Sequence, residues 1–161
     1  IQYKTNYKCL MPTNTFGPND HYNALNSHFL PALIKKVHDL KLNNKKELIL
    51  WGNGLAKREV IYVDDIADAC IFFMKKNFSG TIVNIGTGKD FSIKQYAKII
   101  LNKIIPKNKI KIRYDLSKPN GTPRKVLDIK LANKYGWKPK TKLDEAITKT
   151  YKNFLENNKI V

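Results

Sequence analysis

The sequence predicts an α/β fold, because short apolar runs alternate along the chain with segments of helical periodicity. The apolar runs are four to six residues long, as is usual for strands, and most of them stop at glycine, proline or asparagine. Between them, apolar residues recur at spacings of three and four, which places them on one face of a helix. The 161 residues, 42% of them hydrophobic, suffice for one modest domain with its own core.

In chain order, we expect a buried strand at residues 7–11, then a polar, turn-rich stretch at 14–22. A helix follows, with Asn26 or Ser27 as its cap and Pro31 in its first turn. The later strands are expected at 47–51, 59–63, 81–85 and 109–114. The later helices are expected to begin at Asp64, at Ser92, near Lys130 and near Thr141 or Asp144. Ser92 and Gln95 form a capping box.

The strands at 7–11 and 81–85 pose a structural problem. Only these two look like strands of a parallel sheet, and such a sheet needs several strands with both faces covered. We therefore expect them to be edge pieces of a larger sheet. Residue 1 is Ile, and the residues after it already belong to a periodic element, so we also expect further chain before it.

The formal charge of +17 raises the question of nucleic-acid binding. Only Arg58, Arg113 and Arg124 are arginines; the rest of the 30 basic residues are lysines spread over the whole chain. Readout of bases and forked phosphate contacts favour arginine, and no nucleic-acid-binding motif accompanies the charge. We therefore predict no nucleic-acid partner, although a non-catalytic basic binding module remains the alternative from another class of protein.

Cys9 and Cys70 lie in apolar runs without a second cysteine or histidine at metal-binding spacing, so we expect two buried free thiols and no metal site. A reducing cytoplasm suits them. The sequence contains no run of eighteen apolar residues, and we predict no membrane association.

Three segments carry the first functional signals. Residues 12–18 (Pro-Thr-Asn-Thr-Phe-Gly-Pro) follow a strand, and ligands of open α/β sheets bind beyond the carboxyl ends of strands. Arg58 precedes a buried strand, where its guanidinium is either solvated or aimed at a phosphate. Residues 86–88 (Gly-Thr-Gly) lack the third glycine of a dinucleotide fingerprint, so we interpret them as a turn and not as a phosphate loop.

Together, these segments resemble the C-terminal half of the extended short-chain dehydrogenases/reductases that act on nucleotide sugars. Three further stretches resemble the GDP-L-fucose synthase branch of that family, and the resemblance runs nearly from end to end. They are Asn-Ser-His-Phe-Leu-Pro-Ala-Leu at 26–33, Leu-Trp-Gly-Asn-Gly at 50–54 leading to Arg58, and Lys-Pro-Asn-Gly-Thr-Pro-Arg-Lys at 118–125.

The resemblance implies the C-terminal part of a Rossmann-type NAD(P)-binding protein with a smaller α/β substrate-binding domain. Residues 1–25 and 59–90 would belong mostly to the Rossmann sheet, and residues 26–58 and 91–161 mostly to the substrate-binding domain. The implied activity is that of an NADP-dependent 3,5-epimerase/4-reductase of GDP-4-keto-6-deoxy-mannose. Another nucleotide-sugar epimerase or dehydratase is the alternative within the family, and a homodimer is the implied assembly.

The resemblance also implies roles for individual residues. Pro12, Thr13, Asn14 and Thr15 match a loop that contacts the nicotinamide part of NADP(H), and His28 matches a histidine near both cofactor and sugar that transfers protons. Trp51 and Arg58 match residues that hold GDP.

Two positions depart from the family pattern. Lys36 stands where the family usually has a substrate-binding arginine, so a bidentate phosphate contact is not expected there. Asn120 stands where the family often has aspartate, and it can accept a hydrogen bond from a sugar hydroxyl without contributing charge.

Several family motifs match nothing in this sequence: the glycine-rich cofactor motif, the catalytic serine, the Tyr-x-x-x-Lys pair and the catalytic cysteine. In the family all of them precede the region that this chain matches. We therefore expect the 161 residues to be inactive on their own. Without the resemblance, His28 would be read as a capping residue, Trp51 as part of the core and Trp137 as packing.

Overall fold

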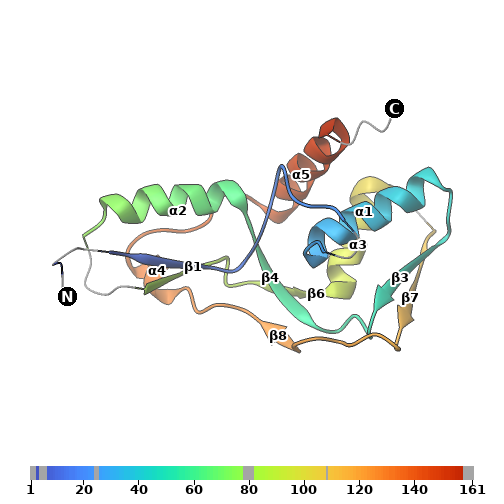
Figure 1. Cartoon of the computed structure of the whole chain (residues 1–161), viewed down its shortest axis with the longest axis horizontal. Coiled ribbons are helices and arrows are strands. Elements are labelled where there is room, and N and C mark those ends of the chain that lie inside the picture. Colours follow the sequence, from blue (N-terminus) through green and yellow to red (C-terminus); the bar gives the residue numbers. More distant parts are fainter. Residues whose placement is uncertain (1–2, 4–6, 24–25, 78–81, 108, 158–161) are drawn as a thin grey trace.

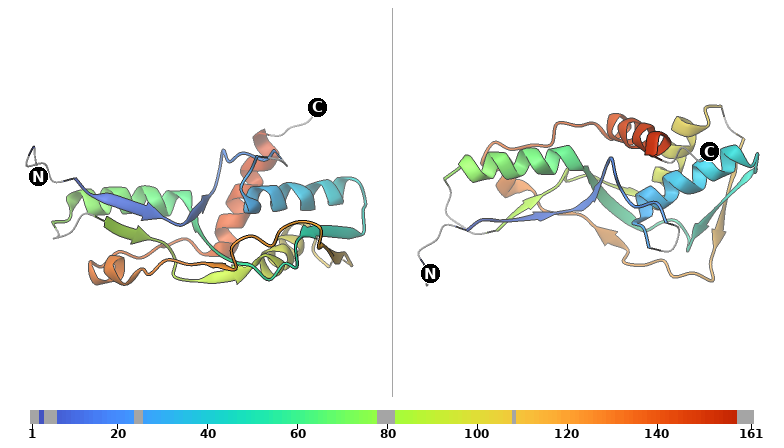
Figure 2. Two further views of the ribbon diagram at one scale, coloured as in Figure 1. Left: turned by 60° about the horizontal axis from the view of Figure 1, so that its bottom comes forward. Right: turned by 45° about the horizontal axis from the view of Figure 1, so that its top comes forward.

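The computed structural model describes residues 3, 7–23, 26–77, 82–107 and 109–157. Figure 1 shows an elongated molecule in which one strand, β4, crosses between two groups of elements. At one end, α2 lies along β1 and β5 with α4 beside them; at the other, α1 and α3 lie beside β3 and β7. Figure 2 shows the same division from two further sides.

The elements alternate between helix and strand, which confirms the α/β prediction. In chain order they are β1 (Cys9–Pro12), β2 (Asn14–Phe16), α1 (Phe29–Leu42), β3 (Glu47–Trp51), β4 (Lys57–Tyr62), α2 (Val63–Lys75), β5 (Ile82–Ile85), β6 (Asp90–Ser92), α3 (Ile93–Ile104), β7 (Lys111–Asp115), β8 (Arg124–Lys125), α4 (Lys130–Lys134) and α5 (Leu143–Asn157).

The described strands form three small sheets. β1 pairs with β5 in parallel, as expected for the two strands of a larger sheet, and β3 pairs with β7 in parallel. β4 is the centre of the third sheet: it pairs in parallel with β2 and β8 and antiparallel with β6. The first residue expected in the strand at 81–85, Thr81, lies outside the described residues.

β4 joins two hydrophobic cores because successive side chains of a strand point to opposite faces. Val60 and Tyr62 are buried in the larger core, which α1, α3, β3 and α5 complete. Ile61, which lies between them, is buried in the smaller core with residues of α2, β5 and α4. The predicted division between residues 58 and 59 therefore falls inside an element that both cores share, and it stays a prediction.

Three short strands were not predicted. β2 was assigned to a turn, which is wrong for residues 14–16, and β6 and β8 were assigned to no strand at all. None of them is longer than three residues. All three gain their hydrogen bonds from β4. A strand whose partner lies more than thirty residues away in the sequence leaves no local periodic signal.

The helix starts were predicted with mixed success. The Ser92–Gln95 capping box of α3 is confirmed, with both reciprocal hydrogen bonds present. Neither Asn26 nor Ser27 caps α1, because its N-cap is His28, whose side chain makes no capping bond. Asp64 is likewise not a cap; Tyr62 precedes α2, and Asp64 lies in the first turn, where its charge favours the helix dipole.

Further expectations concern single side chains. Cys9 and Cys70 are free, as expected, but both are exposed, so the prediction of burial was wrong. Each lies on the outer side of an element whose opposite side carries the core, and the apolar runs did not distinguish the two sides.

Trp137 is buried and donates from its indole N–H to Asp68 at 3.0 Å, which confirms a packing role. No helix among the described residues is long and apolar enough to cross a membrane.

His38 connects α1 to α5. Its Nδ1 lies 3.0 Å from the hydroxyl of Tyr151, and its ring packs edge-on against Phe154. Burial lowers the pKa of His38 below its usual value, and the nearby Lys41 and Lys35 act in the same direction, while Asp39 opposes them.

We predict that the stability of this chain depends on pH through His38. An unfolded histidine titrates near pH ~6.5 and the folded one at lower pH, so in between the unfolded state binds more protons. The contribution of His38 to the free energy of unfolding, measured in urea, is therefore expected to be complete above about pH 6.5. It should be lost as the pH drops through the folded pKa. His38→Gln should flatten this slope, whereas His21→Gln, at an exposed position, should leave it unchanged; an equal slope in all three proteins would exclude His38 as its source.

Candidate functional site

The site is built around Glu59, a fully buried acidic residue of β4. A buried carboxylate is costly unless it is hydrogen-bonded, and this one accepts several bonds. Its Oε1 accepts from the backbone N–H groups of Thr87 at 2.5 Å and Gly88 at 2.6 Å, and its Oε2 accepts from the N–H of Leu127 at 2.7 Å. The side chain of Glu59 thereby fastens the turn after β5 and the segment after β8 to β4.

This network explains the Gly-Thr-Gly sequence at 86–88. A Cβ on Gly86 would lie 2.4 Å from Oε1 of Glu59, so only glycine fits there. Gly88 has φ +66°, a backbone conformation that glycine adopts at little cost. The amide groups of Thr87 and Gly88 thus face a carboxylate of the protein itself and are not directed at an external phosphate, which agrees with the interpretation of this segment as a turn.

The backbone of Glu59 holds the segment after β1. Its carbonyl oxygen accepts from Nδ2 of Asn14 at 2.9 Å and from the hydroxyl of Thr13 at 3.3 Å. The hydroxyl of Thr15 donates to the carbonyl of Thr13 at 3.2 Å, and the N–H of Thr13 donates to the carbonyl of Ile85. The small polar side chains of residues 13–15 are therefore fixed in place, and Oδ1 of Asn14, which has no hydrogen-bond partner among the described residues, is available as an acceptor.

All five residues predicted to bind cofactor line one hollow of about 760 Å³, which we call the His28 pocket. Pro12, Thr13, Asn14 and Thr15 form one wall, and residues 124–127 form another. His28 stands at the N-cap of α1 with its side chain exposed and free of any capping bond. The fold thus brings together residues that lie more than a hundred positions apart in the sequence.

All four residues predicted to bind substrate line a second hollow of about 290 Å³, the Trp51 pocket. Lys36 comes from α1, Trp51 from the end of β3, Arg58 from β4, and Asn120 from the loop between β7 and β8. Ser27 lines this pocket while its neighbour His28 lines the other, so the two hollows adjoin at the start of α1.

Trp51 was read from sequence alone as a core residue, but its side chain is 53% exposed. The ammonium groups of Lys36 and Lys118 lie 5.2 and 5.7 Å from the centre of its ring, within range of a cation–π contact. Partial burial lowers the pKa of Lys36 because the charged form loses hydration. An anion in this pocket would restore the stabilisation of that charge.

Arg58 is anchored from one side only. Its Nη1 donates to the carbonyls of Lys57 at 2.7 Å and Thr122 at 2.6 Å, which fixes the plane of the guanidinium. A Cβ on Gly121 would lie 3.2 Å from its Nη2, so the glycine keeps this end of the guanidinium open. The remaining donors of Arg58 have no bonded partner among the described residues.

Asn120 uses its carbonyl oxygen within the protein. Oδ1 accepts from the N–H of Asn53 at 2.7 Å. A Cβ on Gly52 would lie only 2.4 Å from the same oxygen. This bond fixes the loop between β7 and β8 to the turn after β3, and it leaves the amide NH₂ of Asn120, a residue that lines the pocket, as an available donor.

Two polar residues at or beside the Trp51 pocket, Lys118 and Ser27, were not singled out from the sequence. Lys118 belongs to the 118–125 stretch that was quoted as a whole, and only its distance to the Trp51 ring shows that it adds a positive charge here. Ser27 was considered only as a helix cap, but its buried hydroxyl lacks a hydrogen-bond partner in the described part of the chain. In the sequence, its position next to His28 was the signal that could have indicated a place in the site.

Comparison with known proteins decides the family. The model of the NAD dependent epimerase/dehydratase family matches residues 1–86, more than half of the chain. The chain belongs to this family. Solved structures similar to this chain include a GDP-L-fucose synthetase from Naegleria fowleri bound to NADP, which superposes with a TM-score of 0.83 at 26% sequence identity, over 96% of this chain and 48% of that one.

Two curated proteins similar to this chain are named GDP-L-fucose synthase. A probable GDP-L-fucose synthase 1 of Oryza sativa subsp. japonica is 42% identical over 98% of this chain and 47% of its own length. A GDP-L-fucose synthase of Escherichia coli is 36% identical over 97% of this chain and 51% of its own length. The chain therefore spans about half the length of the curated relatives it matches.

We predict that Glu59→Gln weakens the fold around the His28 pocket. The amide NH₂ would face either the N–H of Leu127 or those of Thr87 and Gly88, and a buried donor set against a donor costs about 1–3 kcal/mol in unfolding free energy. Urea unfolding measures this loss. Glu47→Gln is the matched control, since it breaks only an exposed ion pair with Arg113 and should cost at most about 1 kcal/mol. Equal effects of the two substitutions would contradict a special role for Glu59.

Proposed function

We propose that this chain forms the GDP-sugar-binding part of an NADP-dependent 3,5-epimerase/4-reductase that converts GDP-4-keto-6-deoxy-mannose into GDP-L-fucose. The Trp51 pocket carries the proposal: it gathers an exposed indole, two cationic side chains and an amide donor, with no acidic residue among its described lining residues. Such a set suits a nucleoside diphosphate. The relatives named GDP-L-fucose synthase support the same substrate.

Each lining residue has a part in holding GDP. The indole of Trp51 offers a flat apolar surface to the nucleoside. The open donors of Arg58 and the ammonium of Lys36 face the diphosphate, where charge-assisted hydrogen bonds are shorter and stronger than neutral ones. The NH₂ of Asn120 donates to an oxygen of the nucleotide or sugar, and the hydroxyl of Ser27, which lacks a partner, gains one when a polar ligand group reaches it.

The His28 pocket suits NADP(H). Residues 12–15 offer backbone groups and the free Oδ1 of Asn14 to a carboxamide, and Lys125 adds positive charge on the opposite wall. NADPH, when bound, supplies the hydride that reduces the 4-keto group.

His28 has the proton-transfer role in this proposal. A 4-keto group acidifies the C–H bonds at C3 and C5, and inversion of each centre removes a proton on one face and delivers one on the other. Imidazole can accept or donate a proton near neutral pH. His28 lies where the two pockets adjoin, with a side chain that no capping bond restrains, so it can reach the sugar.

The remaining catalytic groups are proposed to come from the part of the family's length that this chain does not span. We propose that residues 1–25 and 59–90 complete the Rossmann sheet there, while 26–58 and 91–161 form the substrate-binding domain. A homodimer and a cytoplasmic location complete the proposal; the free thiols Cys9 and Cys70 suit a reducing compartment.

Other nucleotide-sugar epimerases and dehydratases remain the second candidate. They differ in the base and sugar that they accept, so competition among GDP, UDP and dTDP for this chain separates the two functions. Tighter binding of GDP than of UDP supports the proposal. Equal binding of the three nucleotides would leave only a general nucleotide-sugar enzyme, and salt-sensitive binding to DNA without nucleotide binding would favour a basic module.

We predict that Arg58→Ala weakens GDP binding to the chain by roughly ten- to a hundredfold, because each lost charge-assisted hydrogen bond is worth about 1.5–3 kcal/mol. Titration calorimetry with GDP measures the change. Arg113→Ala is the matched control, as it removes an exposed arginine that pairs with Glu47 on the sheet of β3 and β7. Unchanged affinity in Arg58→Ala would make Arg58 a surface residue.

We predict that His28→Gln, in a complete enzyme that carries this sequence, impairs epimerisation more than reduction. The reaction is run in deuterated water, and deuterium at C3 and C5 of the product is measured together with its stereochemistry. Loss of proton transfer should reduce deuterium incorporation or yield the wrong stereoisomer, while hydride transfer to a suitable ketone suffers less. Wild-type inversion with weakened cofactor binding would instead make His28 a cofactor-positioning residue.

A further inference from the structure

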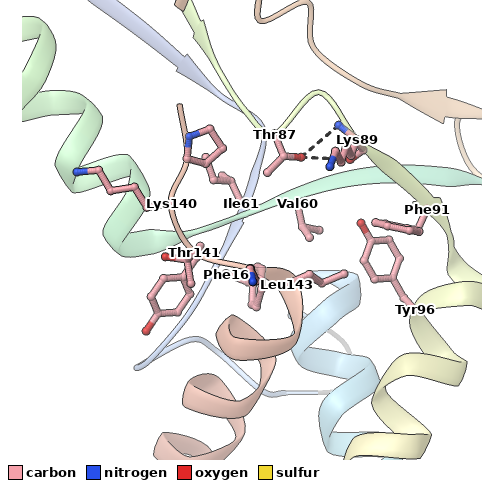
Figure 3. A pocket seen from close by; sticks show the side chains of 13 residues that line it. Phe16, Val60, Ile61, Thr87, Lys89, Phe91, Tyr96, Lys140, Thr141 and Leu143 are labelled. Atoms are coloured by element: carbon pink, nitrogen blue, oxygen red, sulfur yellow. Dashed lines mark hydrogen bonds between the residues drawn. The ribbon is translucent and has the colours of Figure 1, made fainter. Parts of the chain in front are cut away.

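A third hollow, which neither the cofactor nor the substrate proposal uses, opens beside the second half of β4. We call it the Phe91 cavity; its volume is about 360 Å³, within the usual range of small-molecule sites. Figure 3 shows its side chains converging from β2, β4, β6, α3 and the start of α5. It shares no lining residue with the His28 pocket or the Trp51 pocket.

The floor of the Phe91 cavity is apolar and rigid. Phe91 and Tyr96 meet at 5.6 Å with their rings nearly perpendicular, and the hydroxyl of Tyr96 is held by the carbonyl of Arg58 at 2.8 Å. Val60 and Phe16 are buried beside them, and the half-buried Leu143 closes the side toward α5. The half-buried Phe91 and Leu143 offer an apolar surface to an aromatic or aliphatic body, and the buried Tyr96, Val60 and Phe16 hold that surface in place.

The rim is positively charged. Lys89, Lys140 and Lys142 all belong to the lining, and no aspartate or glutamate is among the described residues that do. Lys140 is already paired with Asp68 of α2 at 2.7 Å, and in Figure 3 its side chain extends toward that helix. Lys89 and Lys142 are exposed, and neither has an ion-pair or hydrogen-bond partner for its ammonium in the described ranges between 7 and 157.

Three of the acidic residues near the cavity are engaged elsewhere. Asp65 accepts from the backbone N–H groups of Lys140 and Thr141. Asp90 pairs with Arg124, and Asp144 pairs with Lys103 at 2.7 Å. The ammonium groups of Lys89 and Lys142 have no ion-pair partner among the described residues, so an anion that enters the cavity gains their attraction without displacing an existing partner.

From this combination we infer that the Phe91 cavity is a second ligand site, separate from the nucleotide site, that takes a small amphipathic anion: an aromatic or aliphatic body carrying one carboxylate or similar group. The body lies on the half-buried Phe91 and Leu143, and the charged group remains at the rim between Lys89 and Lys142. The inference does not depend on the proposed nucleotide function, since it uses none of those residues.

The test uses 2-naphthoate as the probe, with the neutral 2-naphthamide and the cationic 2-naphthylmethylamine as matched partners of the same shape. Calorimetry on the 161-residue chain should show naphthoate binding about five- to tenfold more tightly than the amide, the effect of two exposed charge contacts. The amine should bind more weakly than either. Equal affinity of acid and amide would overturn the inference.

Two sets of variants locate the site. Lys89→Gln with Lys142→Gln should reduce the affinity for naphthoate to that of the amide. Lys134→Gln with Lys138→Gln makes the same change in net charge at exposed lysines outside the cavity and should alter the affinity less than about twofold. Equal losses in both double variants would mean general attraction to a basic protein and would overturn the inference.

Leu143→Trp fills the cavity and should abolish binding while circular dichroism shows an intact fold. If that variant does not fold, changes in the amide NMR shifts of the wild-type chain locate the ligand instead. Naphthoate should perturb Thr87, Phe91 and Leu143. Shifts confined to Ser27, Trp51 and Asn120 would place naphthoate in the nucleotide site and overturn the inference. Saturating GDP should leave the affinity for naphthoate unchanged within about twofold; direct competition would overturn the claim that the sites are separate.

Discussion

The carboxylate of Glu59 accepts hydrogen bonds from N–H groups that are 28, 29 and 68 residues away in the sequence. Its carbonyl oxygen meanwhile holds Thr13 and Asn14, so three segments meet at one residue of β4. Because the side chain is fully buried, each missing bond would leave a desolvated polar group, and the geometry of these segments is fixed by that cost. The His28 pocket has two of these three segments as its walls and therefore depends on this network.

β4 has the same linking role for the apolar side chains. Ile61 points into one core and its neighbours Val60 and Tyr62 into the other, so neither core can form without placing the strand for both. The three hollows all have walls on or beside this strand. The Trp51 pocket uses Arg58 at its beginning, the Phe91 cavity uses its second half, and the His28 pocket lies next to the segment that Glu59 holds.

The high positive charge acquires a specific meaning only in the structure. Many lysines are solvated or paired on the surface, as Lys35 is with Asp39 on α1. A few stand where no acid balances them: Lys36 over the Trp51 ring, and Lys89 and Lys142 at the Phe91 cavity. These are positions at which an anionic ligand gains free energy that a solvated surface lysine would not provide.

Sequence by itself determined the α/β class, the bounds of Glu47–Trp51, the capping box of Ser92 and Gln95, and the turn at 86–88, since each depends on local periodicity or on neighbours a few residues apart. The nine predicted site residues, named from motifs, gather in two adjoining hollows, although their roles stay predictions. Tertiary structure alone decided what depends on distant partners. β2, β6 and β8 are strands only because β4 pairs with them, and the oxygen of Asn120 is already used by Asn53. Cys9 and Cys70 are exposed although their neighbours are apolar, because burial depends on which side of an element the core occupies, and a short apolar run does not record that side.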